Sequence, residues 1–297
     1  MPNSSPAPQL SRPITPVVLA CLAATWFVWG STYLAIKFAL AGFPPFAMMG
    51  SRFVVAGALL LVYSVARRNP LPTAIQWRNA AIVGALMLGL GMGGTAYAEL
   101  SVNSGLVVAF IAVTPLLVVI TSLPFGVRPG RGEVVGILVG LAGVLMLTQG
   151  IGFRGSRTGL AAMVIACCGW TLGSVLSQRS LRLAPGASGF SSQMLCGGAV
   201  LLLVAIATGE HPTLSVPLGA WAAWAYLVVF GSLIAFNAYM LLLGRASGGL
   251  ATSYTYVNPI IAMLLGVSLG GEHVTSWEWL SATVILVGVV IMMLSRR

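Results

Sequence analysis

Residues 249–259 have the sequence GLATSYTYVNP, and residues 105–115 have the similar sequence GLVVAFIAVTP. Both stretches lie inside long apolar runs, and each ends on a proline, Pro115 in the first and Pro259 in the second. Because proline removes one hydrogen bond of a helix, we predict a helix break at the same place in each half of the chain. Paired broken helices in corresponding positions are typical of a transport site near the midplane of a membrane.

The composition predicts an integral membrane protein. Of the 297 residues, 58% are hydrophobic and 7% are charged, and the mean hydropathy is +0.97. A helix needs about 20 apolar residues to cross a hydrocarbon core of roughly 30 Å. Ten such runs can be counted between residues 17 and 294. We therefore predict an all-α integral membrane fold with ten transmembrane helices.

The net charge of +10 indicates the orientation of the chain. With ten spans and a cytoplasmic N-terminus, eleven arginines fall on the cytoplasmic side and two, Arg154 and Arg157, fall outside. This bias predicts that both termini are cytoplasmic. Nucleic acid is not an expected partner, because such a chain offers no hydrophilic face to a phosphate backbone.

The organisation is that of one unit written twice. Residues 1–16 are rich in proline and are predicted to form a disordered cytoplasmic tail. Residues 17–149 and 158–294 each hold five of the predicted spans. Because five is odd, the second unit enters the membrane from the opposite side, and we predict two inverted five-helix repeats.

Several motifs have a structural reading. Gly132, Gly136 and Gly140 recur every four residues, which is typical of a seam between closely packed helices, within one chain or between two. Glu210-His211 and Glu272-His273 lack the spacing of metal ligands, and we expect solvated loop residues there. Without a metal motif, a nucleotide loop or a hydrolase motif, we expect no metal, no cofactor and no enzymatic activity.

The first apolar run carries a face of functional interest. Trp26, Gly30, Tyr33 and Lys37 follow one another at helical spacing, and Trp29 borders them. An aromatic stripe that ends in a lysine suits a cavity for an organic ligand. The alternative is packing against lipid or helices, with the Lys37 ammonium extending to the membrane surface.

Arg52 and Glu99 are charged groups expected at membrane depth. A buried arginine in a membrane is costly, so Arg52 should face protein or water and have a partner. Glu99 is the acidic residue nearest to a predicted span on that side of the first half. We therefore predict an ion pair of Glu99 with Arg52 or with Lys37, serving as a structural clamp or as an ion-sensitive gate. Glu99 is also the candidate for proton coupling.

The second half contributes Trp170, Asn237, Tyr254 and Asn258 as candidate binding residues. Trp170 lies deep in the first helix of that half, as Trp29 does in the first half. The other three could bind polar groups of a solute, although hydrogen bonding between helices explains any single one of them nearly as well.

Several stretches together resemble the EamA family of the drug/metabolite transporter superfamily. They are WGSTY at 29–33 leading to Lys37, Arg52-Phe53, LATSYTYVNP at 250–259, and LGGE at 269–272. The twice-five layout is similar along nearly the whole chain. The resemblance implies an inner-membrane permease that exports amino acids, other metabolites or toxic compounds by alternating access. The chain departs from the pattern after the fourth span, where Phe125-Gly126-Val127-Arg128 stands in place of a glutamate that would match Glu272.

The expected function is the export of small organic solutes by a multi-pass secondary transporter of the bacterial inner membrane. Lys37 and Arg52 would receive a carboxylate or another anionic group. Trp29, Tyr33, Trp170 and Tyr254 would bind the apolar part, and protons would be coupled through Glu99. Two alternatives remain open: an uncoupled facilitator of metabolites, and a membrane-embedded protein that handles lipid.

Overall fold

The structure is a computed structural model that describes residues 15–102, 107, 110–149, 156–211, 216–270 and 275–295. The described chain is helical and has no strand. The expected tail lies mostly outside the described residues. Thr15 accepts a hydrogen bond of 3.3 Å from the Val18 amide, and the first helix begins at Pro16.

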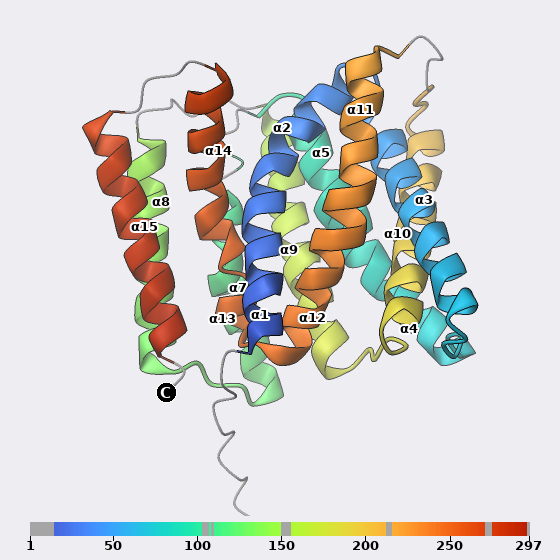
Figure 1. The fold of residues 1–297 in the computed structure, drawn as a ribbon, viewed down its shortest axis with the longest axis horizontal. Coiled ribbons are helices and arrows are strands. Elements are labelled where there is room, and N and C mark those ends of the chain that lie inside the picture. Colours follow the sequence, from blue (N-terminus) through green and yellow to red (C-terminus); the bar gives the residue numbers. More distant parts are fainter. Residues whose placement is uncertain are drawn as a thin grey trace, which may run out of the picture.

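Helices of the first half run back and forth across the bundle, and two of them contain π-helical segments (Figure 1). In chain order these elements are α1 (Pro16–Ala23), η1 (Ala24–Val28, π), α2 (Trp29–Leu40), α3 (Pro45–Ala66), α4 (Ala74–Gly84), η2 (Ala85–Gly93, π), α5 (Gly94–Ala98), α7 (Thr114–Ser122), the short 3₁₀ turn η3 (Leu123–Phe125) and α8 (Arg131–Thr148).

Helices of the second half follow a similar order, with one π-helical segment between α11 and α12. They are α9 (Arg157–Arg179), α10 (Ala187–Ala207), α11 (Leu218–Tyr226), η4 (Leu227–Phe236, π), α12 (Asn237–Arg245), α13 (Gly248–Ala251), α14 (Tyr254–Gly270) and α15 (Ser276–Leu294).

Length and composition make six of the described helices able to cross a membrane: Pro16–Leu40, Pro45–Ala66, Ala74–Ala98, Arg157–Arg179, Ala187–Ala207 and Leu218–Arg245. Two shorter apolar helices, Thr114–Phe125 and Trp279–Leu294, accompany them. The chain is therefore an all-helical protein with several apolar spans. The count of ten spans stays a prediction.

The bundle has two edges and a centre. At one edge α8 packs along α15, and at the other α3 packs along α10, while α2 and α9 lie between them (Figure 1). The beginning of α1 and the end of α15 lie at the same end of the bundle, which is the lower end in Figure 1. We call this the terminal end.

The glycine seam joins α8 to α15. A Cβ atom on Gly136 would lie 2.8 Å from the Gly288 carbonyl oxygen, and a Cβ atom on Gly288 would lie 2.5 Å from the Gly140 amide nitrogen. Any larger residue would push the two backbones apart. The predicted packing seam is confirmed, and its partner is a helix of the same chain.

The helix break of the second half lies before Pro259 rather than at it. Thr252 and Ser253 form the turn between α13 and α14, and Pro259 lies within α14. The Thr252 hydroxyl donates to the Gly248 carbonyl at 2.8 Å, and the Ser253 hydroxyl donates to the Leu250 carbonyl at 2.8 Å. At the break the backbone tightens, because the amides of Ser253, Thr255 and Tyr256 bond to the carbonyls three residues earlier. In the first half, Pro115 lies in the first turn of α7.

Candidate functional site

Four aromatic side chains from both halves meet at the centre of the bundle. They are Trp29 of α2, Trp170 of α9, Tyr239 of α12 and Tyr254 of α14. The Trp29 ring lies 4.6 Å from the Tyr254 ring and 5.2 Å from the Tyr239 ring, between centroids. Trp170 stacks on Tyr239 at 5.2 Å. We call this cluster the aromatic box. Its edge-to-face and stacked contacts make a rigid apolar wall.

The aromatic box borders a small central cavity of about 60 Å³. Trp29, Trp170 and Tyr254 line this cavity together with Tyr33, and further lining comes from η2, α5 and α7. A cavity of this size holds a few water molecules. Sites that bind drug-sized ligands measure about 300–1,000 Å³. The structure therefore shows a conformation that is contracted around the centre.

Several polar atoms next to this cavity have no hydrogen-bond partner among the residues that the structure describes. Both side-chain amide atoms of Asn258 are buried and unpaired, and so is Nε1 of Trp170. The Tyr33 hydroxyl lies near Asn258 but forms no hydrogen bond with it. The hydroxyls of Tyr239 and Tyr254 likewise lie near Nε1 of Trp170 without forming a hydrogen bond to it. Because buried polar groups without partners cost free energy, these atoms can form hydrogen bonds with water or with a polar ligand that enters the cavity.

Arg52 of α3 lies behind the aromatic box rather than in the cavity. It is 1% exposed, and its Nε donates to the Ser232 hydroxyl at 2.8 Å. Trp29 Nε1 donates to the Gly231 carbonyl at 3.3 Å, and a Cβ atom on Gly231 would lie 2.5 Å from Nη2 of Arg52. The backbone of Gly231 thus lies between the Arg52 guanidinium and Trp29 of the aromatic box. This close approach occurs within η4, and π-helical segments frequently mark functional sites.

Glu99 follows α5, one residue beyond the apolar segment Ala74–Ala98. Its Oε1 atom is buried and has no hydrogen-bond partner within the described part of the chain. Burial raises the pKa of Glu99 to about 8, although the positive charge of Lys37 opposes this shift. Glu99 also lies near Tyr33, which lines the central cavity.

The predicted ion pairs of Glu99 are not formed among the described side chains. Arg52 instead uses a serine hydroxyl and lies 4.8 Å from the Phe53 ring centroid. Lys37 is exposed, as the alternative reading of its helix face expected. The reason is depth: Arg52 lies on the inner face of α3 towards η4, whereas Glu99 lies at the end of its helix.

The structure brings half of the predicted binding residues together at one cavity. Trp29, Tyr33, Trp170 and Tyr254 line it. Asn258 lies beside Tyr33, whereas Arg52, Lys37 and Asn237 do not line it in this conformation. The Asn237 amide donates to the Leu233 carbonyl at 2.6 Å within its own helix.

Tyr239 is a central residue that the list of candidates omits. It is fully buried, completes the aromatic box and shares a hydrogen bond of 2.9 Å with the Ser174 hydroxyl. In the sequence, the available signal for a polar partner at this place was Ser174, which follows Trp170 by one helical turn of α9. The signal is weak because serine at that spacing is common in any helix interface.

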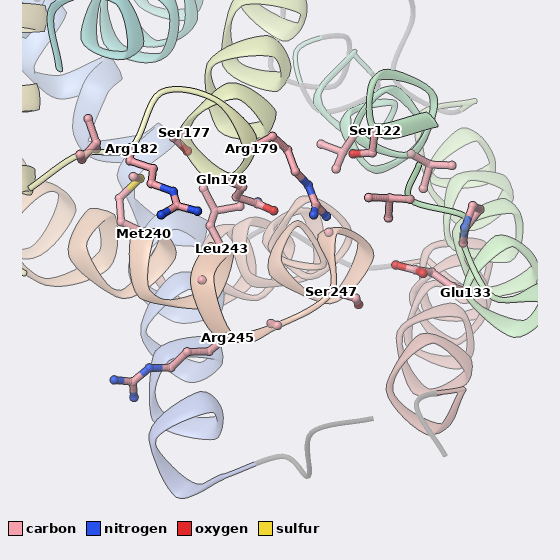
Figure 2. A pocket seen from close by; sticks show the side chains of 18 of the residues that line it. Ser122, Glu133, Ser177, Gln178, Arg179, Arg182, Met240, Leu243, Arg245 and Ser247 are labelled. Carbon is pink, nitrogen blue, oxygen red and sulfur yellow. The ribbon is translucent and has the colours of Figure 1, made fainter. Parts of the chain in front are cut away.

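A large vestibule opens at the terminal end of the bundle. It measures about 1130 Å³ and is lined by the ends of α7, α9 and α12 and by the start of α8 (Figure 2). Its charged residues are Arg128, Glu133, Arg179, Arg182 and Arg245. Of these elements, α7 and α9 also line the central cavity, and α9 and α12 contribute to the aromatic box. The vestibule therefore lies on the terminal side of the central cavity.

At the opposite end of the bundle, a clamp that the sequence did not indicate joins α10 to α3. The Glu210 carboxylate, just after α10, accepts hydrogen bonds from the backbone amides of Phe46 at 3.1 Å and Ala47 at 2.7 Å. These amides belong to the first turn of α3, where helices attract negative charge. The expectation of a solvated loop residue is wrong for Glu210, because the packing of α10 on α3 brings the two ends together. Glu272 and His273 lie outside the described residues.

Comparison with known proteins agrees with this architecture. The model of the EamA-like transporter family matches residues 15–149 and again residues 157–294. An uncharacterized inner membrane transporter of Escherichia coli K12, YedA, is 39% identical over 280 residues, which cover 94% of this chain and 91% of that protein. An uncharacterized transporter of Synechocystis, sll0355, is 27% identical and covers 90% of this chain and 87% of its own length.

A solved crystal structure shares the fold. It superposes with a TM-score of 0.77 at 22% sequence identity, and the match covers 95% of this chain and 99% of that one. The family model covers nearly the whole sequence, and the family and its relatives are membrane transporters. The chain therefore belongs to the EamA-like transporter family.

Proposed function

We propose that this protein is a secondary transporter that exports small organic solutes across a bacterial inner membrane by alternating access. One observation carries the proposal: a contracted central cavity lies between helices of both halves, and a vestibule opens from that region at the terminal end. By the positive-inside rule, the arginines at this end support a cytoplasmic orientation for it and for both termini. Solute then enters through the vestibule and leaves at the opposite end.

The pairing of helices supports the inverted repeat on which this mechanism rests. The second helix of each half, α3 and α10, pack together, and so do α8 and α15, the last helix of each half. The third helix of each half carries a π-helical segment, η2 and η4. Contacts between equivalent elements are what a pseudo-twofold axis produces.

The chemistry of the centre suits an aromatic or apolar solute with polar groups. The aromatic box offers ring faces and edges to the apolar part. Asn258 and Trp170 offer the unpaired amide atoms and the unpaired N–H to the polar part. Arg52 lies one backbone away and has no carboxylate partner among the described residues, so expansion of the cavity past Gly231 would present it to an anionic group.

Glu99 is the proposed proton-coupling group. With a pKa of about 8, its carboxyl is mainly neutral at pH 7 and becomes charged as the pH rises through that value. Charging it beside Lys37 and Tyr33 changes the field at the cavity. Uptake should therefore vary with pH in the wild type and become insensitive to pH in Glu99→Gln, while Glu210→Gln at the same end retains the pH dependence.

Reconstituted protein tests the whole proposal. Proteoliposomes receive a radiolabelled panel of amino acids and lipophilic aromatic acids, with and without an imposed pH gradient. Accumulation above equilibrium only with the gradient supports a proton-coupled carrier. Equilibration that ignores the gradient would favour the uncoupled facilitator, which the low number of acidic residues, five in the chain, also favours. Absence of any solute flux would contradict both.

A further inference from the structure

Arg179 and Arg182 of the vestibule face a cavity and not only the membrane surface. Among the described residues that line it are Arg128, Arg179, Arg182 and Arg245, against a single acidic residue, Glu133. Oε1 of Glu133 is already used, because it accepts a hydrogen bond of 2.9 Å from the Gly249 amide. In Figure 2 the side chains of Arg179 and Arg182 extend across the pocket, whereas Arg245 extends away from it. The vestibule therefore has an excess of positive charge.

Orientation in the membrane does not by itself explain this placement. Positive charge at the cytoplasmic end satisfies the positive-inside rule wherever it lies. Arg67 and Arg68 follow α3 at the same end, since Ser64 near the end of α3 hydrogen-bonds Ser188 near the start of α10. Both are exposed, and neither lines the vestibule. At this one end, the chain thus has arginines that line the vestibule and arginines that lie on the outer surface.

The walls of the vestibule strengthen the effect of these charges. Apolar side chains such as Val118, Phe190 and Leu243 lie among the arginines. A concave site with low-dielectric walls focuses the electric field and raises the local concentration of ions of opposite charge. Arginine also binds carboxylate, sulfonate and phosphate groups through two parallel hydrogen bonds. The mixture of arginine and apolar surface fits an anion that carries an apolar body.

Two helices, α9 and α7, connect this charge to the centre. Along α9, Trp170 lies in the aromatic box and Arg179 in the vestibule, two to three helical turns further on. Along α7, Thr114 lines the central cavity and Ser122 the vestibule. An anion held by Arg179 and Arg182 is therefore positioned at the entrance to the site.

We infer that the vestibule is a recruitment site for organic anions, namely small carboxylates with an aromatic or aliphatic body. This inference rests on the proposed transport function and names the class of solute. It does not depend on proton coupling or on Glu99.

Binding of naphthalene-2-carboxylate, with the neutral naphthalene-2-carboxamide as its matched probe, tests the inference. Full-length protein in phosphatidylcholine nanodiscs is studied by equilibrium dialysis at low and high salt. The wild type should bind the carboxylate more tightly than the amide, and high salt should weaken the binding of the carboxylate but not that of the amide. Arg179→Gln with Arg182→Gln should lower the carboxylate affinity about tenfold and leave the amide unchanged. The control Arg67→Gln with Arg68→Asn keeps the affinity; Asn tolerates the left-handed backbone at position 68.

Equal binding of both probes by the wild type, or an equal loss of both in the vestibule variant, would overturn the inference. The first comparison needs no variant, so a folding defect in the double substitution leaves the test intact. Loss of carboxylate binding when phosphatidylglycerol replaces part of the lipid would also overturn it, because a lipid headgroup would then occupy the vestibule. Flux of the neutral amide into proteoliposomes tests transport separately and distinguishes failure of this inference from failure of the proposed function.

Discussion

Removal of the Glu210 clamp should destabilise the protein by a predictable amount. The carboxylate caps two amides in the first turn of α3, a helix of 22 residues, and so ties the second half to the first. Loss of a side-chain cap costs about 0.5–2 kcal/mol, and loss of a favourable charge at a helix N-terminus costs about 0.3–1 kcal/mol. Glu210→Ala removes both and should cost about 2 kcal/mol. Glu210→Gln keeps an oxygen acceptor and should cost about 1 kcal/mol.

Thermal unfolding of the purified protein in detergent measures this effect. For a chain of this size, about 2 kcal/mol corresponds to a fall in melting temperature of about 4–8 °C. His211→Ala is the matched control, because His211 is the exposed neighbour of Glu210 and should leave the melting temperature unchanged. If Glu210→Ala, Glu210→Gln and His211→Ala all melt within 1 °C of the wild type, the clamp contributes nothing and the reasoning fails.

Three further substitutions test the seam and the centre. Gly288→Leu should lower the melting temperature markedly, since overpacking costs about 1–3 kcal/mol, whereas Gly219→Ala, with open space around it, should not. Arg52→Met should preserve the melting temperature, because it removes a buried charge that has no counter-ion among the described residues. It should also reduce carboxylate uptake relative to amide uptake; a large loss of stability would contradict this. Trp170→Phe keeps an aromatic ring but loses the unpaired N–H. KM for uptake of a polar aromatic solute should therefore rise about fivefold at equal expression. An unchanged KM would exclude Trp170 as a hydrogen-bond donor to the solute.

Much of the helical fold and part of the site follow from local sequence patterns. Trp29, Tyr33, Trp170 and Tyr254 meet at one cavity because each lies on an inward face of an apolar helix, and helical periodicity is visible in a sequence. The burial of Arg52 was predictable for the same reason, since its position along α3 fixes its depth.

Contacts between distant elements were beyond the reach of such patterns. The clamp of Glu210 depends on where α10 ends relative to the start of α3, and helix ends are not fixed by hydropathy alone. The ion pair of Glu99 failed for a similar reason, because a shared side of the membrane does not imply a shared depth. The break at Thr252 and Ser253 is a local tightening of the backbone, whose amides there bond to carbonyls three residues earlier, and Pro259 lies downstream of it within α14.

The small size of the central cavity has a consequence for the membrane that surrounds the protein. Space for only a few water molecules does not support a continuous file of water between the vestibule and the far end. In the conformation described, ions and protons therefore meet an electrical seal made of tryptophan and tyrosine rings. The empty carrier would let a cell keep its membrane potential, and conductance would be confined to the moments when a solute has forced the rings apart.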